Sequence, residues 1–394
     1  MIEFDTLFHA FEQTKNVCRC CEESGADEVA KRFLLIRSLD KKSLKEIVAA
    51  CTTEDTDGDY PVLYRKVYRS SVSVSDLLRH IEGKRQELIR ERETELAGLS
   101  SVIADFPVVN CGVRNDKIDD IVKAFVRNKS IKSREALIRK LDVDILPRVR
   151  QYCLWSYYNQ TSNDIIELFF LKHPAVIPTL RKIPNIDFFL KVGDRILPFD
   201  LKFTHISDSY FDLASQGIVR DSDPTHHDDF FIRPDSGSGE RQKIKTFYTA
   251  LKKARRELAL PNISGLDKNA LCNLLTATGD ESAVRFVSEI KRAHRKYVPE
   301  NSDALYPLEW WNYKYQGERL FCNNNRFFVF LAYNEQFVDG RELKGRTKEI
   351  GERITGLLDT ISEDKLHTVR YHYDKEPGLI GDYSALSVSV IYSE

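Results

Sequence analysis

Residues 186–204 contain the pattern that most restricts the fold, two short apolar segments joined by Gly193 and Asp194. A two-residue connection of this composition suits a β-hairpin, because its backbone conformation matches the twist of paired strands. In the resulting register Asp187 faces Asp200 across the hairpin. We therefore predict two directly opposed aspartates. An extra residue in the turn, without a compensating bulge, would move Asp187 to the other face.

Opposed aspartates repel each other, since cross-strand partners have Cβ atoms about 5 Å apart. A divalent cation such as Mg²⁺, which prefers carboxylate oxygens, offsets that repulsion. Lys202 follows Asp200 by two residues and so lies on the same face, whereas Phe199, Leu201 and Phe203 point to the other face as core. The pattern predicts a polar face that carries acids for a metal ion together with one lysine.

The apolar segment before the hairpin contains a single isolated acid. Residues 163–171 are typical of a short helix in which large apolar side chains surround Glu167. An unpaired carboxylate is costly in such a place, so we expect Glu167 to face the metal site or to bind a metal-bound water. Asp164 lies three residues earlier on roughly the same side of the helix and is a second candidate.

A helical Glu, a strand Asp and an Asp-x-Lys on the paired strand resemble the PD-(D/E)xK nuclease superfamily, which includes most type II restriction endonucleases. The resemblance covers roughly residues 160–260, with 326–334 as a further core strand. It departs from the motif at one place, because Pro184 stands three residues upstream of Asp187 and not directly before it. The resemblance implies an α+β fold with a restriction-endonuclease-like mixed sheet flanked by helices.

The resemblance also implies the roles of the candidate residues. Asp187, Asp200, the backbone carbonyl of Leu201 and Glu167 would hold one or two Mg²⁺ ions at the scissile phosphate. Lys202 would orient the attacking water and stabilise the charge of the transition state. A structural interpretation stays open beside this one, in which Asp187 merely begins a strand and Lys202 merely neutralises Asp200.

The remainder of the chain divides near residue 155. Residues 1–155 indicate a helical domain for DNA contact or dimerisation, with helices expected at 28–37, 43–50, 75–100, 117–126 and 133–141. Residues 156–394 alternate helices with strands and are expected to form the catalytic domain. Its expected strands are 186–192, 195–204, 326–333, 368–373 and 385–392. The aromatic segment 306–315 is expected to be core and not a base-stacking surface.

The 394-residue chain carries 59 basic and 60 acidic residues, a net charge of −1, so DNA binding requires a local basic patch. A helix expected at 240–260 supplies the main candidate. Its basic side is formed by Arg241, Lys245, Lys252 and Arg256. A solvated surface helix explains the same pattern. The basic segment 130–141 is a further candidate.

The eight cysteines are scattered, and the sequence has neither a secretory signal nor a segment of transmembrane length. These features predict a cytoplasmic protein with reduced thiols and no membrane contact. The one cluster, Cys18, Cys20 and Cys21, lacks a usual zinc-ligand spacing, so packing is favoured over a zinc site.

These features predict a Mg²⁺-dependent deoxyribonuclease that cleaves double-stranded DNA, most like a sequence-specific type II restriction endonuclease. A palindromic recognition sequence would imply a homodimer. Two alternatives stay open. One is a nuclease of the same fold in repair, recombination or phage defence, and the other is a non-catalytic DNA-binding protein of that fold.

Overall fold

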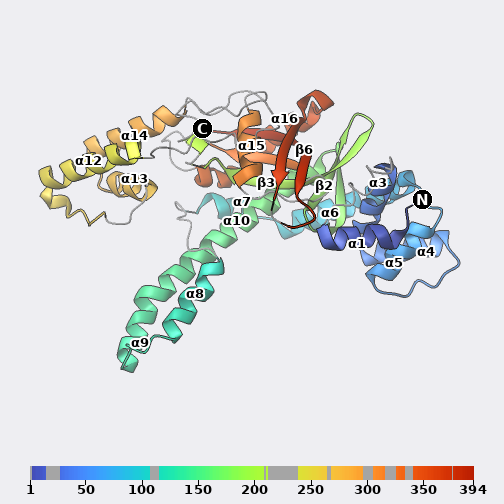
Figure 1. The fold of residues 1–394 in the computed structure, drawn as a ribbon, viewed down its shortest axis with the longest axis horizontal. Coiled ribbons are helices and arrows are strands. Elements are labelled where there is room, and N and C mark those ends of the chain that lie inside the picture. The colour runs from blue at the N-terminus through green and yellow to red at the C-terminus, as the bar shows by residue number, and fades with distance from the viewer. Residues whose placement is uncertain are drawn as a thin grey trace. The chain divides into compact units, whose positions relative to one another are not determined.

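The computed structural model describes residues 2–14, 27–106, 115–207, 210–211, 238–263, 268–295, 305–315, 325–332, 340–374 and 376–394. The fold is mixed α+β, with a six-stranded mixed sheet flanked by helices (Figure 1). This confirms the predicted fold class. Cys18, Cys20 and Cys21 lie outside the described residues. Within the described ranges, none of the helices is both long and apolar enough to cross a bilayer.

The sheet has the strand order β1-β2-β3-β4-β6-β5. Its strands are β1 (Val176–Ile183), β2 (Ile186–Val192), β3 (Arg195–His205), β4 (Arg326–Leu331), β5 (His367–Tyr373) and β6 (Gly381–Tyr392). β1 pairs antiparallel with β2, β4 pairs parallel with both β3 and β6, and β5 pairs antiparallel with β6. All six residues of β4 are buried, as expected of a central strand covered on both faces.

The N-terminal region is helical, as predicted. Its elements are α1 (Phe4–Thr14), α3 (Asp27–Arg37), α4 (Lys41–Cys51), α5 (Tyr60–Arg69), α6 (Val74–Glu95), α7 (Leu99–Ala104), α8 (Asn115–Val126), α9 (Arg134–Lys140) and the π-helix η1 (Leu141–Ile145). Local capping sets several starts: Asp40 accepts a hydrogen bond from Ser43 N at 2.6 Å, and Ser73 forms a capping box with Asp76.

The later helices lie before, between and after the strands along the chain. They are α10 (Leu146–Lys172), α12 (Ser238–Ala254), η2 (Arg256–Leu258), α13 (Lys268–Ala277), α14 (Glu281–Arg295), α15 (Tyr306–Tyr315), η5 (Gly340–Gly345), α16 (Thr347–Asp359) and η6 (Glu363–Lys365). The aromatic segment forms α15, and Trp310, Trp311 and Tyr313 are buried in the core, as predicted.

The contacts within the chain divide it into two compact units. Unit 1 combines residues 1–4, 28–198 and 341–361, and unit 2 combines residues 5–27, 199–340 and 362–394. α10 is one continuous helix that runs through residue 155. Whether residues 1–155 fold independently of 156–394 stays a prediction.

Candidate active site

Glu167 lies on α10 of unit 1. This helix begins at Leu146, whereas the sequence predicted a short helix over residues 163–171. Its neighbours Ile166 and Phe170 are buried, and the Phe170 ring stacks on Phe188 of β2 at 4.8 Å between centroids. This contact holds the last turns of α10 against β2. Glu167 and Asp187, one on each element, are thereby brought near each other.

The Glu167 carboxyl group is in an unfavourable electrostatic position. Burial, followed by repulsion from Asp187 and then Asp164, raises the pKa of Glu167 from 4.5 to about 7. Lys182 and Arg92 lower it by smaller amounts. Glu167 makes no hydrogen bond or ion pair with any residue that the structure describes. A carboxylate placed in this way favours either a proton or a bound cation.

A cavity of about 200 Å³ adjoins this group of acids. Its lining includes the acids Glu167, Asp164 and Asp187 and the basic residues Arg92, Arg181 and Lys182. The pairing of β1 with β2 is irregular between residues 178 and 183, where the register shifts. Such irregularities include β-bulges, which often lie beside active sites because they turn side chains away from the regular ladder.

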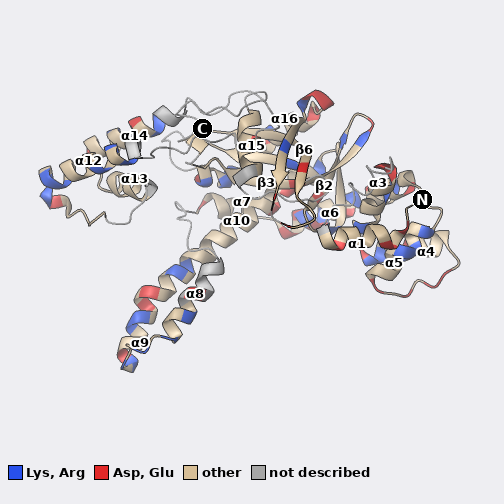
Figure 2. Ribbon diagram, viewed as in Figure 1, with Lys and Arg blue, Asp and Glu red and all other residues tan. Residues whose placement is uncertain are grey.

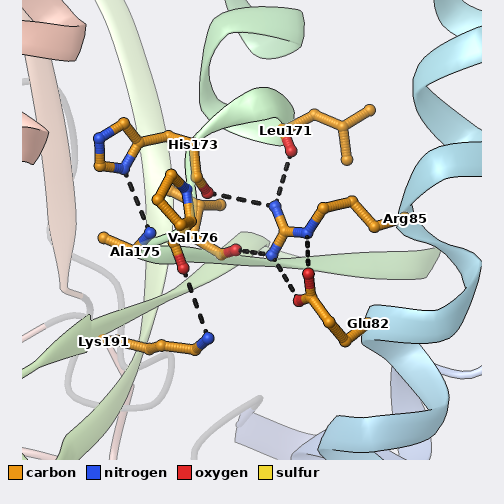
Figure 3. Close-up of polar contacts among 8 residues, drawn as sticks. Glu82, Arg85, Leu171, His173, Ala175, Val176 and Lys191 are labelled. Atoms are coloured by element: carbon orange, nitrogen blue, oxygen red, sulfur yellow. Dashed lines mark hydrogen bonds and ion pairs between the residues drawn. The ribbon is translucent and has the colours of Figure 1, made fainter.

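Arg85 of α6 connects the end of α10, the helix that carries Glu167, to the start of β1 (Figure 3). Its guanidinium group donates to the carbonyl oxygens of Leu171 at 2.7 Å and His173 at 3.1 Å, and also to that of Val176. Glu82 accepts two further bonds from Arg85, at 2.7 and 2.8 Å. Arg85 thus satisfies backbone acceptors at the end of α10 and the start of β1, groups that helix termini leave unpaired.

Asp200 and Lys202 lie on β3, in the part that belongs to unit 2. Lys202 Nζ is 2.7 Å from Asp200 Oδ1 and 2.6 Å from Oδ2, so the two side chains share one face of the strand as predicted. Asp200 is 5% exposed. Phe199 and Phe203 are buried on the other face, while Leu201 is partly exposed.

Two residues beside Asp200 were not predicted as part of the site. Arg326 of β4 is the register partner of Asp200, and its Nε lies 4.0 Å from Asp200 Oδ2. The Arg326 guanidinium is fully buried over the ring of Tyr313, 4.6 Å from its centroid. In the sequence, Arg326 is recognisable only as a basic residue at the first position of an apolar strand. Pairing between strands separated by over a hundred residues cannot be inferred from that feature.

The turn that sets the predicted hairpin register is present. β2 ends at Val192 and β3 begins at Arg195, and Gly193 has the positive φ of 56° that such a turn requires. Asp187 belongs to unit 1 and Asp200 to unit 2. Their pairing, and the complete set of Glu167, Asp187, Asp200 and Lys202, stay predictions.

The predicted Mg²⁺ ligands fit a magnesium ion by their chemistry. The carboxylates of Glu167, Asp187 and Asp200 and the carbonyl of Leu201 are oxygen donors, which Mg²⁺ prefers. Burial, followed by repulsion from Asp187 and Asp164, disfavours the charged form of Glu167 and raises its pKa to about 7. Among the described residues, no three or more His, Cys, Asp or Glu side chains are grouped closely enough to hold a metal ion.

The predicted basic helix is shorter than expected and ends at Ala254. Arg241 and Lys245 on α12 are partly buried, and Lys252 is exposed. Arg256 is also exposed, but it lies in η2, so it does not continue the basic side of the helix. Ile244 and Leu251 are buried on the opposite side as predicted.

Comparison with models of known protein families, with curated proteins and with solved structures found no match for this chain. The chain has two groups of side chains whose geometry and electrostatics suit chemistry. One group has acids around a cavity, and the other has an aspartate held by a lysine. The first group contains oxygen donors of the kind that bind a hard cation, and the second contains an ammonium group.

Proposed function

We propose that this chain is a Mg²⁺-dependent endonuclease that hydrolyses phosphodiester bonds of double-stranded DNA, most like a type II restriction endonuclease acting as a homodimer. The observation that carries the proposal is the group of three acids around one cavity, with a Glu167 pKa of about 7. Strongly perturbed acids in a cavity are typical of functional sites. The Asp200–Lys202 pair supports the proposal because it reproduces the Asp-x-Lys motif of the PD-(D/E)xK superfamily.

In this proposal Asp187, Asp200, Glu167 and the carbonyl of Leu201 hold Mg²⁺. When bound, the ion would polarise the phosphoryl oxygen and lower the pKa of a bound water. Lys202 positions the attacking water and donates hydrogen bonds to the phosphate oxygens as their charge grows. Asp200 keeps the Lys202 ammonium group in place through its two short contacts. Attack by water breaks the bond from phosphorus to O3′ and leaves a 5′-phosphate.

A plasmid cleavage assay with Mg²⁺, and with EDTA as a blank, tests the proposal. Asp200→Asn and Lys202→Met are expected to lower the cleavage rate at least about 100-fold, because each removes a group that acts on the reacting atoms. The matched controls are Asp194→Asn in the turn and Lys191→Met on β2, both exposed on the same hairpin. These controls are expected to cleave at the wild-type rate.

The products distinguish the kinds of nuclease. Discrete fragments support a restriction endonuclease, whereas smearing or nicking supports a nuclease with structural selectivity. Intact plasmid from well-folded protein would leave only a DNA-binding role. Cleavage by Asp200→Asn at the wild-type rate would overturn the proposed active site.

A further inference from the structure

Helices α12, α13 and α14 form a small helical bundle between β3 and β4 of the sequence, here called the three-helix module. Its apolar core includes Ile244, Leu271, Leu275 and Val287, all buried. Phe247 of α12 and Phe286 of α14 stack with their ring centroids 4.0 Å apart. The core joins all three helices, so their exposed faces are held in a defined arrangement.

The second and third helices of the module are joined by a three-residue turn, Thr278–Gly279–Asp280. Gly279 has a φ of 67°, a conformation that suits glycine. The Asp280 carboxylate accepts hydrogen bonds from the backbone N–H groups of Ser282 at 2.9 Å and Ala283 at 3.2 Å, which fixes the start of α14. Two helices joined by a short turn that contains glycine are the layout of the helix-turn-helix motif.

The module has a large positive charge in a chain that is nearly neutral. Residues 238–263 and 268–295 contain twelve lysines and arginines against five aspartates and glutamates, a net charge of +7, whereas the whole chain has −1. Figure 2 shows basic residues along α12 and α14. Such a concentration of charge is complementary to a polyanion and supplies the local patch that DNA binding requires.

The most basic end of α12 lies beside the start of α14. Arg255 Nε is 3.3 Å from Asp280 Oδ2, in the turn that precedes α14. Lys252 and Lys253 are exposed in the last turn of α12, just before Arg255. Cations at this place can contact phosphates that flank a groove occupied by α14.

The outward face of α14 carries groups that suit contact with base edges. Ser282, Val284, Arg285 and Glu289 are exposed, and the Arg285 side chain is 82% exposed. An α-helix fits the major groove of B-DNA, where arginine reads guanine and an apolar group contacts the methyl of thymine. In helix-turn-helix proteins the second helix of the motif occupies this groove.

We propose that the three-helix module binds duplex DNA, with α14 in the major groove and Lys252 and Lys253 on the flanking phosphates. This assigns base reading to a part of the chain distinct from the proposed catalytic residues. DNA binding by the module rests on the proposed function in one respect, that DNA is the substrate. DNA binding without cleavage would contradict only the proposed catalytic activity. Cleavage without DNA binding by the module would contradict only the role of the module.

The first test measures binding of the full-length protein to a mixed-sequence DNA duplex in EDTA, by fluorescence anisotropy over a series of salt concentrations. Lys252→Gln/Lys253→Gln is expected to weaken binding about tenfold or more and to reduce the salt slope by about 2. The matched control is Lys41→Gln/Lys42→Gln, an exposed lysine pair on α4 in unit 1. It is expected to bind like the wild type, and circular dichroism verifies that both variants are folded.

The second test selects preferred duplexes from a randomised library, again in EDTA, with wild type and with Arg285→Lys. Lysine keeps the positive charge but cannot reproduce the bidentate hydrogen bonds of arginine with guanine. The selected sequence is therefore expected to change at one or two positions. Equal effects of the two lysine pairs, or an unchanged selected sequence, would overturn the proposal. Tighter binding of double-stranded RNA than of DNA would also overturn it.

Discussion

Glu167 and Glu309 are two shielded glutamates with opposite surroundings. Glu309 on α15 is fully buried and accepts hydrogen bonds from the hydroxyl groups of Ser387 and Ser389, while His367 Nδ1 lies 2.7 Å away. Glu167 on α10 is partly buried, makes no hydrogen bond to the described residues and lies near two further acids. Two carboxylates shielded from solvent can therefore differ completely in their polar neighbours.

The two carboxylates differ in their polar neighbours. The partners of Glu309 come from β5 and β6, so its charge stabilises the packing of α15 on the sheet. Glu167 lines a cavity and has repulsive neighbours, and the proposed Mg²⁺ would supply the positive charge that these neighbours do not. We expect mutation of Glu309 to affect stability most, and mutation of Glu167 to affect pH dependence and activity.

The largest effect is expected for Glu309→Ala. The substitution leaves two buried hydroxyl groups and a histidine without their acceptor and creates a cavity, at a cost of about 4 kcal/mol in the free energy of unfolding. Urea denaturation followed by circular dichroism measures it. Glu352→Ala, at an exposed position on α16, is the control and is expected to change stability by less than about 0.5 kcal/mol. A cost of Glu309→Ala as small as that of the control would contradict the structural role.

The sequence predicted best those elements whose signals are local. The turn at Gly193 and the apolar run of β4 identified β2, β3 and β4, and the two-residue period placed Lys202 beside Asp200. These patterns depend only on neighbouring residues. Arg326, the cross-strand partner of Asp200, lies over a hundred residues away, and His367, the partner of Glu309, lies over fifty residues away. Local patterns contain no information about such pairs.

Among the elements that the sequence did not predict, β1 and the first half of α10 have identifiable physical reasons. β1 contains Pro178, and a proline usually argues against a strand, but β1 lies at the edge of the sheet where proline is tolerated. The first half of α10 leaves Leu146 and Leu154 exposed, so its apolar residues do not repeat on one buried side. The buried side of α10 begins at Tyr158, so only the C-terminal part of the helix has the periodicity that a packed helix shows.

The next largest loss of stability is expected for Arg85→Ala. Like Glu309, Arg85 is a buried charged residue with hydrogen-bond partners. The loss of Arg85 leaves three backbone carbonyls and Glu82 without their donor, at a cost of about 3 kcal/mol. Arg79→Ala on the same helix is the control, because Arg79 is exposed and pairs only with Asp76 at 2.9 Å. Thermal unfolding of both variants measures the difference, and equal melting temperatures would show that Arg85 does not fasten α10 to β1.

The smallest effect on stability, and the most informative, is expected for Glu167→Gln in EDTA. The pKa of Glu167 is raised in the folded protein, so the wild type loses stability as pH rises from 4.5 through about 7, opposite to a salt-bridged acid. Glutamine removes this penalty. We expect Glu167→Gln to match the wild type below pH 4.5 and to exceed it by about 1 to 2 kcal/mol above pH 7, after allowance for solvent in the cavity.

Glu352→Gln provides the baseline for the same pH series, since its side chain is exposed on α16. A further measurement adds Mg²⁺ above pH 7 and compares the melting temperatures of the wild type and Glu167→Gln. An ion bound beside Glu167 stabilises the folded wild type by mass action, so its melting temperature should rise more than that of Glu167→Gln. If Glu167→Gln and Glu352→Gln followed the same pH curve, and Mg²⁺ raised both melting temperatures equally, Glu167 would be no more than a shielded side chain. Glu167 and Glu309 would then differ in hydrogen bonding alone.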